Sequence, residues 1–210
     1  VKIGTVGHVL DNLDVKIQAD GEITVKGPSV FQGYYKDDEK TKEAFTEDGY
    51  FMTGDIGHID EEGFLHITDR KKEMFKTSGG KYVAPQVLEN LAKGSKFIEQ
   101  IMVVGDGEKM PCALVQPDYA FAKLWAERKH LKIGKTPEEM ANSPELKARI
   151  MKDINLLNAT LGKWEQIKKI ELTPTLWTIE DGLLTPTMKL KRKAVKEKFF
   201  NLYEKLYDRA

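Results

Sequence analysis

Basic residues cluster where an uncharged stretch leads into the last part of the chain. In GLLTPTMKLKRKAV (residues 182–195), the basic side chains are Lys189, Lys191, Arg192 and Lys193. Glycine and proline break any helical period ahead of Lys189, so we expect this lysine at a loop tip, just before a helix that begins near Leu190. Cations in the first turn oppose the helix dipole, so helix stability does not explain the cluster. An anionic ligand, a solubilising face and an anionic membrane surface are the alternatives.

A second basic cluster surrounds two consecutive glycines in TDRKKEMFKTSGGKYVAP (residues 68–85). Its members are Arg70, Lys71, Lys72, Lys76 and Lys81. The segment Ser78–Gly80 has little side-chain bulk, so its backbone amides can approach an anion or an extended ligand closely. Strand alternation predicts that Arg70, Lys72 and Lys76 share one face. A solvated basic hairpin explains the same pattern equally well.

One carboxylate stands at an informative position. Asp55 lies between Gly54 and Ile56 in YFMTGDIGHID, where we expect a strand to leave a tight turn. A carboxylate fixed there can accept two hydrogen bonds from a diol such as a ribose. The alternative is a turn aspartate that accepts from its own backbone, and this stretch taken alone favours that alternative.

Three other patterns predict no site. Gly134–Thr136 reads GKT, but a phosphate-binding loop needs a glycine five positions earlier, where Lys129 stands. The histidines have neither i,i+4 spacing nor acidic or cysteine companions, so we predict no metal site. Cys112 is the single cysteine and lies in the apolar stretch MPCALVQP, which favours a small core residue in a reducing compartment.

The composition excludes several classes of protein. Lys+Arg and Asp+Glu number 33 each, so the chain as a whole does not attract nucleic acid or anionic lipid. A hydrophobic content of 40% over 210 residues suffices for one large domain or two small ones. No apolar run is long enough to span a bilayer and there is no signal-peptide pattern, so we expect a cytoplasmic protein. Strand-like sequence starts directly at Val1, which suggests a piece of a longer chain.

The expected secondary structure changes near residue 70. Before that point, short alternating runs are separated by turns such as Asp20-Gly21 and Glu62-Gly63, which predicts antiparallel strands and one short helix beginning near Asp37. After it, we expect helices over residues 85–93, 143–162 and 190–207, and strands over 97–105, 112–117 and 166–172. In the first of these helices, Val87, Leu88 and Leu91 should form the buried face.

These elements predict an α+β fold in two parts. Residues 1–69 should form a small β-barrel-like lobe, and residues 70–210 a compact α+β domain whose small sheet is flanked by helices. No Pro/Gly linker separates the two parts, so we expect a narrow hinge at residues 69–72, the form that hinges take in proteins whose domains close on ligands.

Three stretches, in this order along the chain, resemble the C-terminal portion of the adenylate-forming superfamily. They are GEITVKGPSVFQGYYKDDEKTKEAF, DGYFMTGDIGHIDEEGFLHITDRKKEMFKTSGGKYVAPQVLEN and LLTPTMKLKRKAV. The superfamily includes acyl-CoA synthetases, luciferases and the adenylation domains of peptide synthetases. The resemblance runs over essentially the whole chain. The form LTPTMKLKR and the helical arm over residues 119–162 are similar to the long-chain fatty acid branch.

The resemblance implies roles for the residues before and at the hinge. Asp55 falls where the family binds the ribose hydroxyls of ATP and of the acyl adenylate, and Arg70 is its companion at the ribose. Lys72 stands at the hinge position. Residues 1–69 would then be the end of the large N-terminal domain, and residues 70–210 the C-terminal AMP-binding-enzyme domain.

The resemblance also implies roles after the hinge. Lys76 matches a residue that faces the nucleotide or the thiol in the second step. Ser78 and Gly79, with Gly80, match the loop that lies along the pantetheine of CoA. Lys189 matches the lysine that contacts the α-phosphate and the acyl carboxylate during adenylation.

The implied activity is ATP-dependent ligation of a long-chain fatty acid to CoA through an acyl-AMP, with ATP, CoA and Mg²⁺ as cofactors. The family's phosphate loop, of the form TSGTTG, and its acyl pocket are absent from this sequence. We therefore predict that ATP and Mg²⁺ are bound mainly by the large N-terminal domain, and that this chain alone is inactive.

Two alternatives stand beside this interpretation. A relative could adenylate the acid in the same way and pass the acyl group to a carrier-protein thiol. A non-enzymatic module could use the terminal basic helix to dock on a membrane or on nucleic acid. Zero net charge disfavours the second alternative, and we expect no nucleic-acid partner. A weak peripheral membrane association of the full enzyme stays compatible with the sequence, because a long-chain fatty acid resides in membranes.

Overall fold

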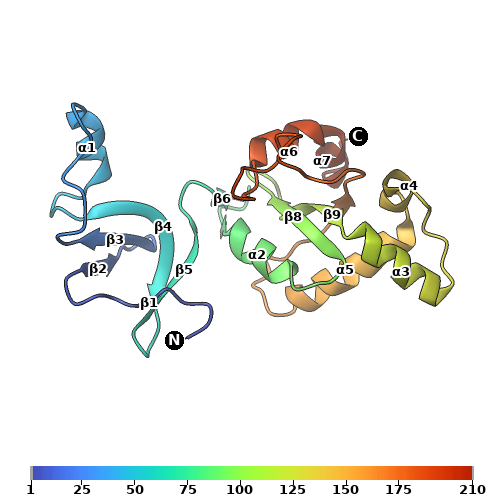
Figure 1. Cartoon of the computed structure of the whole chain (residues 1–210), viewed down its shortest axis with the longest axis horizontal. Helices are drawn as coiled ribbons and strands as arrows, with labels where there is room; N and C mark the ends of the chain where they lie inside the picture. Colours follow the sequence, from blue (N-terminus) through green and yellow to red (C-terminus); the bar gives the residue numbers. More distant parts are fainter. Residues whose placement is uncertain (1, 210) are drawn as a thin grey trace. The chain divides into compact units, whose positions relative to one another are not determined.

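An antiparallel sheet is the main structural element of the first part of the chain (Figure 1). The computed structural model describes residues 2–209, and the chain divides between Met74 and Phe75 into two units. The sheet of the first unit has the order β1-β5-β4-β3-β2. Its strands are β1 (Gly7–His8), β2 (Asp14–Ile17), β3 (Glu22–Lys26), β4 (Phe51–Ile59) and β5 (Phe64–Arg70).

Tight turns set the register of this sheet. Gly21 and Gly63 adopt φ of +85° and +84° in the turns before β3 and β5, as the sequence predicted. At Gly57 the chain passes close to the neighbouring strand, because a Cβ there would lie 2.1 Å from the carbonyl oxygen of His66. The register of β4 and β5 shifts beside it, between Ile56 and Gly57, so Gly57 permits a bulge.

A short helix, α1 (Asp38–Ala44), lies between β3 and β4 in the sequence. The carboxylate of Asp37 accepts from the N–H of Lys40 and caps the helix, which begins where the sequence predicted. Ile23 and Tyr50 are the buried hydrophobic side chains of this unit, within the described residues. The first unit therefore has a thin core of its own.

The second unit carries a three-stranded sheet between helices (Figure 1). Its strands are β8 (Ile98–Val104), β9 (Cys112–Pro117) and β10 (Ile170–Leu172), and β6 (Phe75–Lys76) and β7 (Tyr82–Val83) form a separate hairpin. The helices are α2 (Pro85–Ala92), α3 (Tyr119–Lys129), α4 (Pro137–Ala141), α5 (Pro144–Asn158), α6 (Arg192–Lys198) and α7 (Phe200–Leu206). β9 pairs antiparallel with β8 and parallel with β10.

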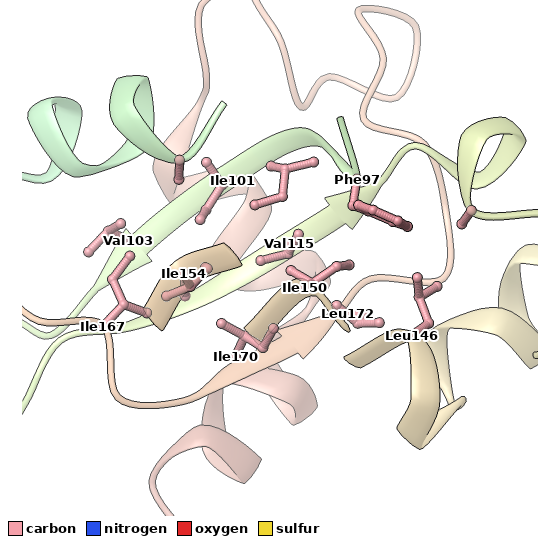
Figure 2. Close-up of a cluster of buried hydrophobic side chains, with 14 of the residues drawn as sticks. Phe97, Ile101, Val103, Val115, Leu146, Ile150, Ile154, Ile167, Ile170 and Leu172 are labelled. Carbon is pink, nitrogen blue, oxygen red and sulfur yellow. The ribbon is translucent and has the colours of Figure 1, made fainter. Parts of the chain in front are cut away.

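Both faces of this sheet are covered. Ile101 and Val103 of β8 pack in a cluster with side chains of α2, α3 and α5, which Figure 2 shows around Ile150 and Ile154. Met102 and Val104 alternate to the other face, where they pack in a second cluster with side chains of α6 and α7. Strands buried on both faces read as continuous apolar runs, which explains the sequences IMVV and CALV. The predicted α+β fold with a flanked sheet is confirmed.

Three details differ from the sequence prediction. Leu91 of α2 is 51% exposed, and Glu89 is buried in its place for a reason given below. The strand predicted over residues 166–172 is shortened to β10. The side chain of Asn158 accepts from the N–H of Ile167 (2.9 Å) and donates to its carbonyl (2.8 Å), so these backbone groups are not available for strand pairing. The last helix is interrupted at Phe199, whose backbone leaves the helical region at φ −110° and ψ 32°.

One other prediction is confirmed. The thiol of Cys112 is fully buried in β9, and burial raises its pKa, so it is a core residue. Among the described residues, no helix is both long enough and apolar enough to cross a membrane.

Candidate functional site

Asp55 and Arg70 face each other across two strands of the first unit. They are paired positions of β4 and β5, and the Nε of Arg70 lies 2.7 Å from Oδ1 of Asp55. The side chains are 23% and 56% exposed, so the pair is open to solvent on the arginine side. The N–H of Asp55 donates to the hydroxyl of Thr53 (3.1 Å). A strand pair, not a turn, therefore holds this carboxylate.

A buried carboxylate that the sequence analysis missed holds the backbone next to Asp55. Glu22 is 4% exposed and accepts from the N–H of Gly54 (3.0 Å) and from the ammonium of Lys71 (2.7 Å). Lys71 also pairs with Asp20 (2.7 Å), and the carboxylates of Asp20 and Glu22 raise the pKa of Lys71. The N–H of Lys71 in turn donates to the carbonyl of Gly54 (2.8 Å). The only sequence signal was an acid at the start of a strand that otherwise reads ITVK.

Lys72 lies in a turn, and this corrects the prediction that Arg70, Lys72 and Lys76 share one face of a strand. The N–H groups of Glu73 and Met74 both donate to the carbonyl of Arg70 (2.9 and 3.1 Å), so the chain turns where alternation was expected to continue. Lys72 and Arg70 instead line one groove of about 530 Å³, together with Glu22 and Thr53. Lys76 belongs to the second unit.

The Ser78–Gly80 loop is the tip of the β6–β7 hairpin. Thr77 is buried and closes the loop, because its N–H donates to the carbonyl of Lys81 (2.9 Å) and its carbonyl accepts from the N–H of Gly80 (2.8 Å). Gly80 adopts φ of +77°, where a side chain would be strained. Ser78, Gly79 and Gly80 are all exposed, so their backbone is accessible to a ligand. Sequence reasoning did not single out Thr77, which fixes this geometry.

Lys76 stands at the base of the same hairpin. It is paired with Tyr82 across β6 and β7, and its ammonium lies 5.6 Å from the centroid of the Tyr82 ring. The carbonyl of Lys76 accepts from the N–H of Gly107, and the N–H of Ser78 donates to the carbonyl of Glu108 (2.9 and 2.8 Å). The structure thus gathers Lys76 and the Ser78–Gly80 loop on one hairpin and anchors it to the turn between β8 and β9.

Lys189 is exposed at the tip of a tight hairpin of its own. Its carbonyl accepts from the N–H of Thr185 and its N–H donates to the Thr185 hydroxyl (2.8 and 3.0 Å). Leu184 and Leu190 form an antiparallel bridge below this turn, and Met188 adopts φ of +60° inside it. The predicted loop tip is confirmed as geometry; the helix begins later, at Arg192.

The base of the Lys189 hairpin is fixed by a buried ion pair. Arg192 places one guanidinium nitrogen 2.7 Å from Oε2 of Glu89, while the other donates to the carbonyl of Val103 (3.3 Å). The N–H of Val103 donates to Oε1 of Glu89 (2.7 Å). Burial raises the pKa of Glu89 to about 7, and the charge of Arg192 opposes that rise. One member of the basic cluster therefore has a partner inside the protein, which is why α2 turns Glu89 inward.

No cluster of three or more metal-ligating side chains exists among residues 2–209. His58 and His66 stack with ring centroids 4.7 Å apart, and His66 contacts Asp60 at 2.9 Å. The chain offers carboxylates and cations, not a preformed metal centre, on the part that the structure describes.

Comparison with known proteins identifies the second unit. Residues 73–210 match the family of the AMP-binding enzyme C-terminal domain. The chain belongs to this family. The matched range includes Lys76, the Ser78–Gly80 loop and Lys189, whereas Asp55, Arg70 and Lys72 precede it.

Similar proteins match all or nine-tenths of the chain. The long-chain-fatty-acid–CoA ligase FadD15 of Mycobacterium tuberculosis is 42% identical over 209 residues, which cover 100% of this chain and 35% of that ligase. The adenylation domain of a carboxylate reductase from Mycobacterium chelonae superimposes with a TM-score of 0.71 at 30% identity, over 90% of this chain and 28% of that one. A carboxylic acid reductase domain from Segniliparus rugosus, in complex with AMP and a co-purified carboxylic acid, gives 0.71 at 27% identity with the same coverage. These matches confirm the resemblance to adenylate-forming enzymes.

Proposed function

We propose that this chain is the C-terminal part of an AMP-forming ligase that joins a long-chain fatty acid to CoA through an acyl adenylate. The observation that carries the proposal is the similarity to a long-chain-fatty-acid–CoA ligase, which extends over the whole chain at 42% identity and covers the Lys189 hairpin. The chain spans 35% of that ligase, so the acyl pocket and the phosphate loop would lie in the remainder.

Lys189 supplies the charge that the first half-reaction needs. A fatty-acid carboxylate attacks the α-phosphorus of ATP, an acyl O–P bond forms, and the P–O bond to pyrophosphate breaks. Two anions must approach before any bond forms, and charge grows on the phosphoryl oxygens. An ammonium on a flexible stem at an exposed hairpin tip can be delivered to that point and withdrawn again.

Asp55 and Arg70 fit the ribose of the nucleotide. A carboxylate held by a cross-strand guanidinium at 2.7 Å keeps acceptor capacity for a diol, and the pair is exposed on one side. Lys72, which lines the groove beside Arg70, and the neighbouring turn act as the hinge in this proposal. Mg²⁺ would offset phosphate charge, held mainly by the remainder of the enzyme.

The second half-reaction uses the other hairpin. The CoA thiol attacks the carbonyl carbon of the acyl adenylate, the C–S bond forms, and AMP leaves. Lys189 has no task in this step, whereas the exposed backbone of Ser78, Gly79 and Gly80 can lie along an extended chain such as pantetheine. The proposal is that the second unit turns about residues 69–72 between the two steps, so that each hairpin serves one reaction.

A chimera tests the proposal. The 209 matched residues of FadD15 are replaced by this chain, and palmitate-dependent pyrophosphate exchange and acyl-CoA formation are measured. We expect both activities from the chimera and neither from this chain alone. A chimera that unfolds as cooperatively as FadD15 but makes no acyl-AMP would contradict the proposal, as would turnover by the isolated chain.

The carrier-protein alternative has one observation in its favour, the similarity to carboxylate reductase adenylation domains. The same chimera separates the two functions. Release of acyl-AMP as thioester by free CoA supports the CoA ligase, while transfer only to a carrier-protein thiol supports the alternative.

A further inference from the structure

A pocket in the second unit combines an aromatic wall with a ring of cations. It has a volume of about 340 Å³, and Trp164 lines it together with Met110 and Pro111. Its lysines are Lys109, Lys163, Lys168 and Lys169. None of the lining residues, all of which lie in the described part of the chain, is acidic. Neither half-reaction outlined above uses these residues.

Trp164 is placed for contact with a ligand more than for packing. Its side chain is 48% exposed, and it is absent from both core clusters of the described residues. Its indole lies against Gly162, since a Cβ on that glycine would be only 3.1 Å from Cζ2 of the ring. The ammonium of Lys81 lies 5.5 Å from an indole ring centroid, near the outer limit of a cation–π contact. A large aromatic face is thus held in one orientation and left open.

The lysines around this face are only partly neutralised. Lys169 pairs with Asp208 (2.6 Å), and Lys168 contacts the neutral side chain of Gln166 (2.5 Å). Lys109 and Lys163 make no ion pair within residues 2–209. Several cations within one small pocket suit a ligand that carries more than one negative group. A flat ring beside clustered phosphates is the chemistry of a nucleotide.

The pocket adjoins the Ser78–Gly80 loop. Thr77, which closes that loop, is also one of the lining residues. The turn that supplies Lys109 is bonded to the hairpin through Ser78 and Glu108 (2.8 Å). A ligand whose nucleotide lies in the pocket could therefore continue along the exposed glycines of the loop.

We propose that this pocket binds the nucleotide end of CoA, with the adenine stacked on Trp164 and the 3′-phosphate and the diphosphate among the lysines. ATP shares an adenine and clustered phosphates with CoA. CoA alone carries a long chain on its diphosphate that can follow the neighbouring loop, and this part of the inference rests on the proposed function.

Titration of the 210-residue chain with adenosine 3′,5′-bisphosphate tests the pocket without any acyl transfer. Calorimetry gives the affinity, and the indole N–H signal of Trp164 in NMR spectra reports the site. We expect Trp164→Ala to weaken binding about tenfold, while Trp164→Phe keeps most of it because a phenyl ring still stacks. Because Trp164 is half-exposed, both variants should unfold like the parent, as monitored by the fluorescence of Trp125 and Trp177.

Two double lysine-to-glutamine variants, one inside the pocket and one outside it, test whether the pocket lysines bind the ligand. Lys163→Gln with Lys168→Gln should weaken binding several-fold and reduce its dependence on salt. Lys123→Gln with Lys152→Gln removes the same charge from exposed helical positions outside the pocket and should leave the affinity unchanged. CoA should bind more tightly than 3′-dephospho-CoA, and both more tightly than AMP.

Four results would overturn the inference: no measurable binding of the bisphosphate, equal affinity of Trp164→Ala and the parent, equal losses from the two lysine pairs, or tighter binding of ATP or an adenine oligonucleotide. The FadD15 chimera decides the proposed function separately. If the bisphosphate binds at Trp164 but the chimera is inactive, the pocket proposal stands and the ligase proposal is contradicted. If the chimera is active but the bisphosphate does not bind, the ligase proposal stands and the pocket proposal is contradicted.

Discussion

Two arginine–carboxylate pairs in this protein have the same length and opposite settings. Arg70 lies 2.7 Å from Asp55 in the first unit, and Arg192 lies 2.7 Å from Glu89 in the second. The arginine side chains are 56% and 25% exposed, and the carboxylates 23% and 9%. Glu89 also accepts from the N–H of Val103, and Arg192 donates to the carbonyl of Val103. One pair is therefore open to solvent on its arginine side, whereas the other holds a buried carboxylate under a partly buried arginine.

The difference shows that distance alone does not assign a role to an ion pair. An exposed pair gains little energy, because water competes for both charges, so a ligand can join it at little loss. A buried pair is costly to break, because the remaining charge is left without water or partner. We interpret Asp55–Arg70 as a contact for a ligand, and Glu89–Arg192 as the clamp that holds the base of the Lys189 hairpin.

Removal of the buried arginine should have the largest effect on stability. We expect Arg192→Met to lower the free energy of unfolding of the second unit by about 3 kcal/mol at pH 8, because Glu89 stays buried without its partner. All three tryptophans lie in the second unit, so their fluorescence during urea unfolding reports this unit. Arg70→Met is the matched control in the first unit, where hydrogen exchange of the β4 and β5 amides should show a change in the free energy of unfolding of less than about 1 kcal/mol. Equal losses from the two variants would remove the distinction.

The titration of Glu89 sharpens the comparison. Burial raises the pKa of Glu89 from 4.5 to about 7. A carboxyl group with a raised pKa contributes stability that is complete below its unfolded pKa and is lost as pH rises through its folded pKa. Glu89→Gln cannot titrate, so its stability relative to the parent should rise between pH 5 and pH 8, by up to ~3 kcal/mol.

The measurement is the difference in unfolding free energy between Glu89→Gln and the parent at several pH values. The loss of the ion pair sets the offset between the two proteins, and the titration sets the slope. A difference that does not vary between pH 5 and pH 8 would show that Glu89 is fully ionised throughout and would contradict the raised pKa.

Asp55→Asn should have the smallest effect on stability and a clear effect on function. We expect a change below about 1 kcal/mol in the unfolding of the first unit, followed by hydrogen exchange of the β4 amides. In the FadD15 chimera, the same substitution should raise the KM for ATP, because an amide is a poorer acceptor for ribose hydroxyls. If Asp55→Asn destabilised the first unit and left the KM for ATP unchanged, Asp55 would have a structural role and the proposed contact with the ribose would be contradicted.

The sequence predicted most of the scaffold because local signals agreed with packing. Helices begin next to Asp37 and Ser143 where expected, because both side chains cap them, and the apolar runs of β8 and β9 form a sheet covered on both faces. The mistakes arose where a long-range polar contact overrides a local pattern. Leu91 is displaced from the buried face of α2 because Glu89 finds a partner 103 positions later in the chain. No window of sequence around α2 contains that information.

For the candidate site too, the sequence indicated residues that form local patterns but not those that support them through hydrogen bonds. The sequence indicated Asp55, Arg70 and Lys189, and the structure places the first two in contact and the third at a hairpin tip. The supporting residues were not indicated: Glu22 accepts from the N–H of Gly54 next to Asp55, and the hydroxyl of Thr77 donates to the carbonyl of Lys81 at the end of the Ser78–Gly80 loop. Supporting residues of this kind leave no spacing pattern, whereas glycine pairs and lysine clusters do.

The central claim is that Lys189 serves one half-reaction and not the other. The most direct measurement is the rate of each step in the FadD15 chimera with and without Lys189→Ala. We expect palmitate-dependent pyrophosphate exchange to fall by about 10²–10³-fold, and thioester formation from supplied palmitoyl-AMP and CoA to keep its rate. Equal loss in both steps, or unchanged exchange, would contradict the account.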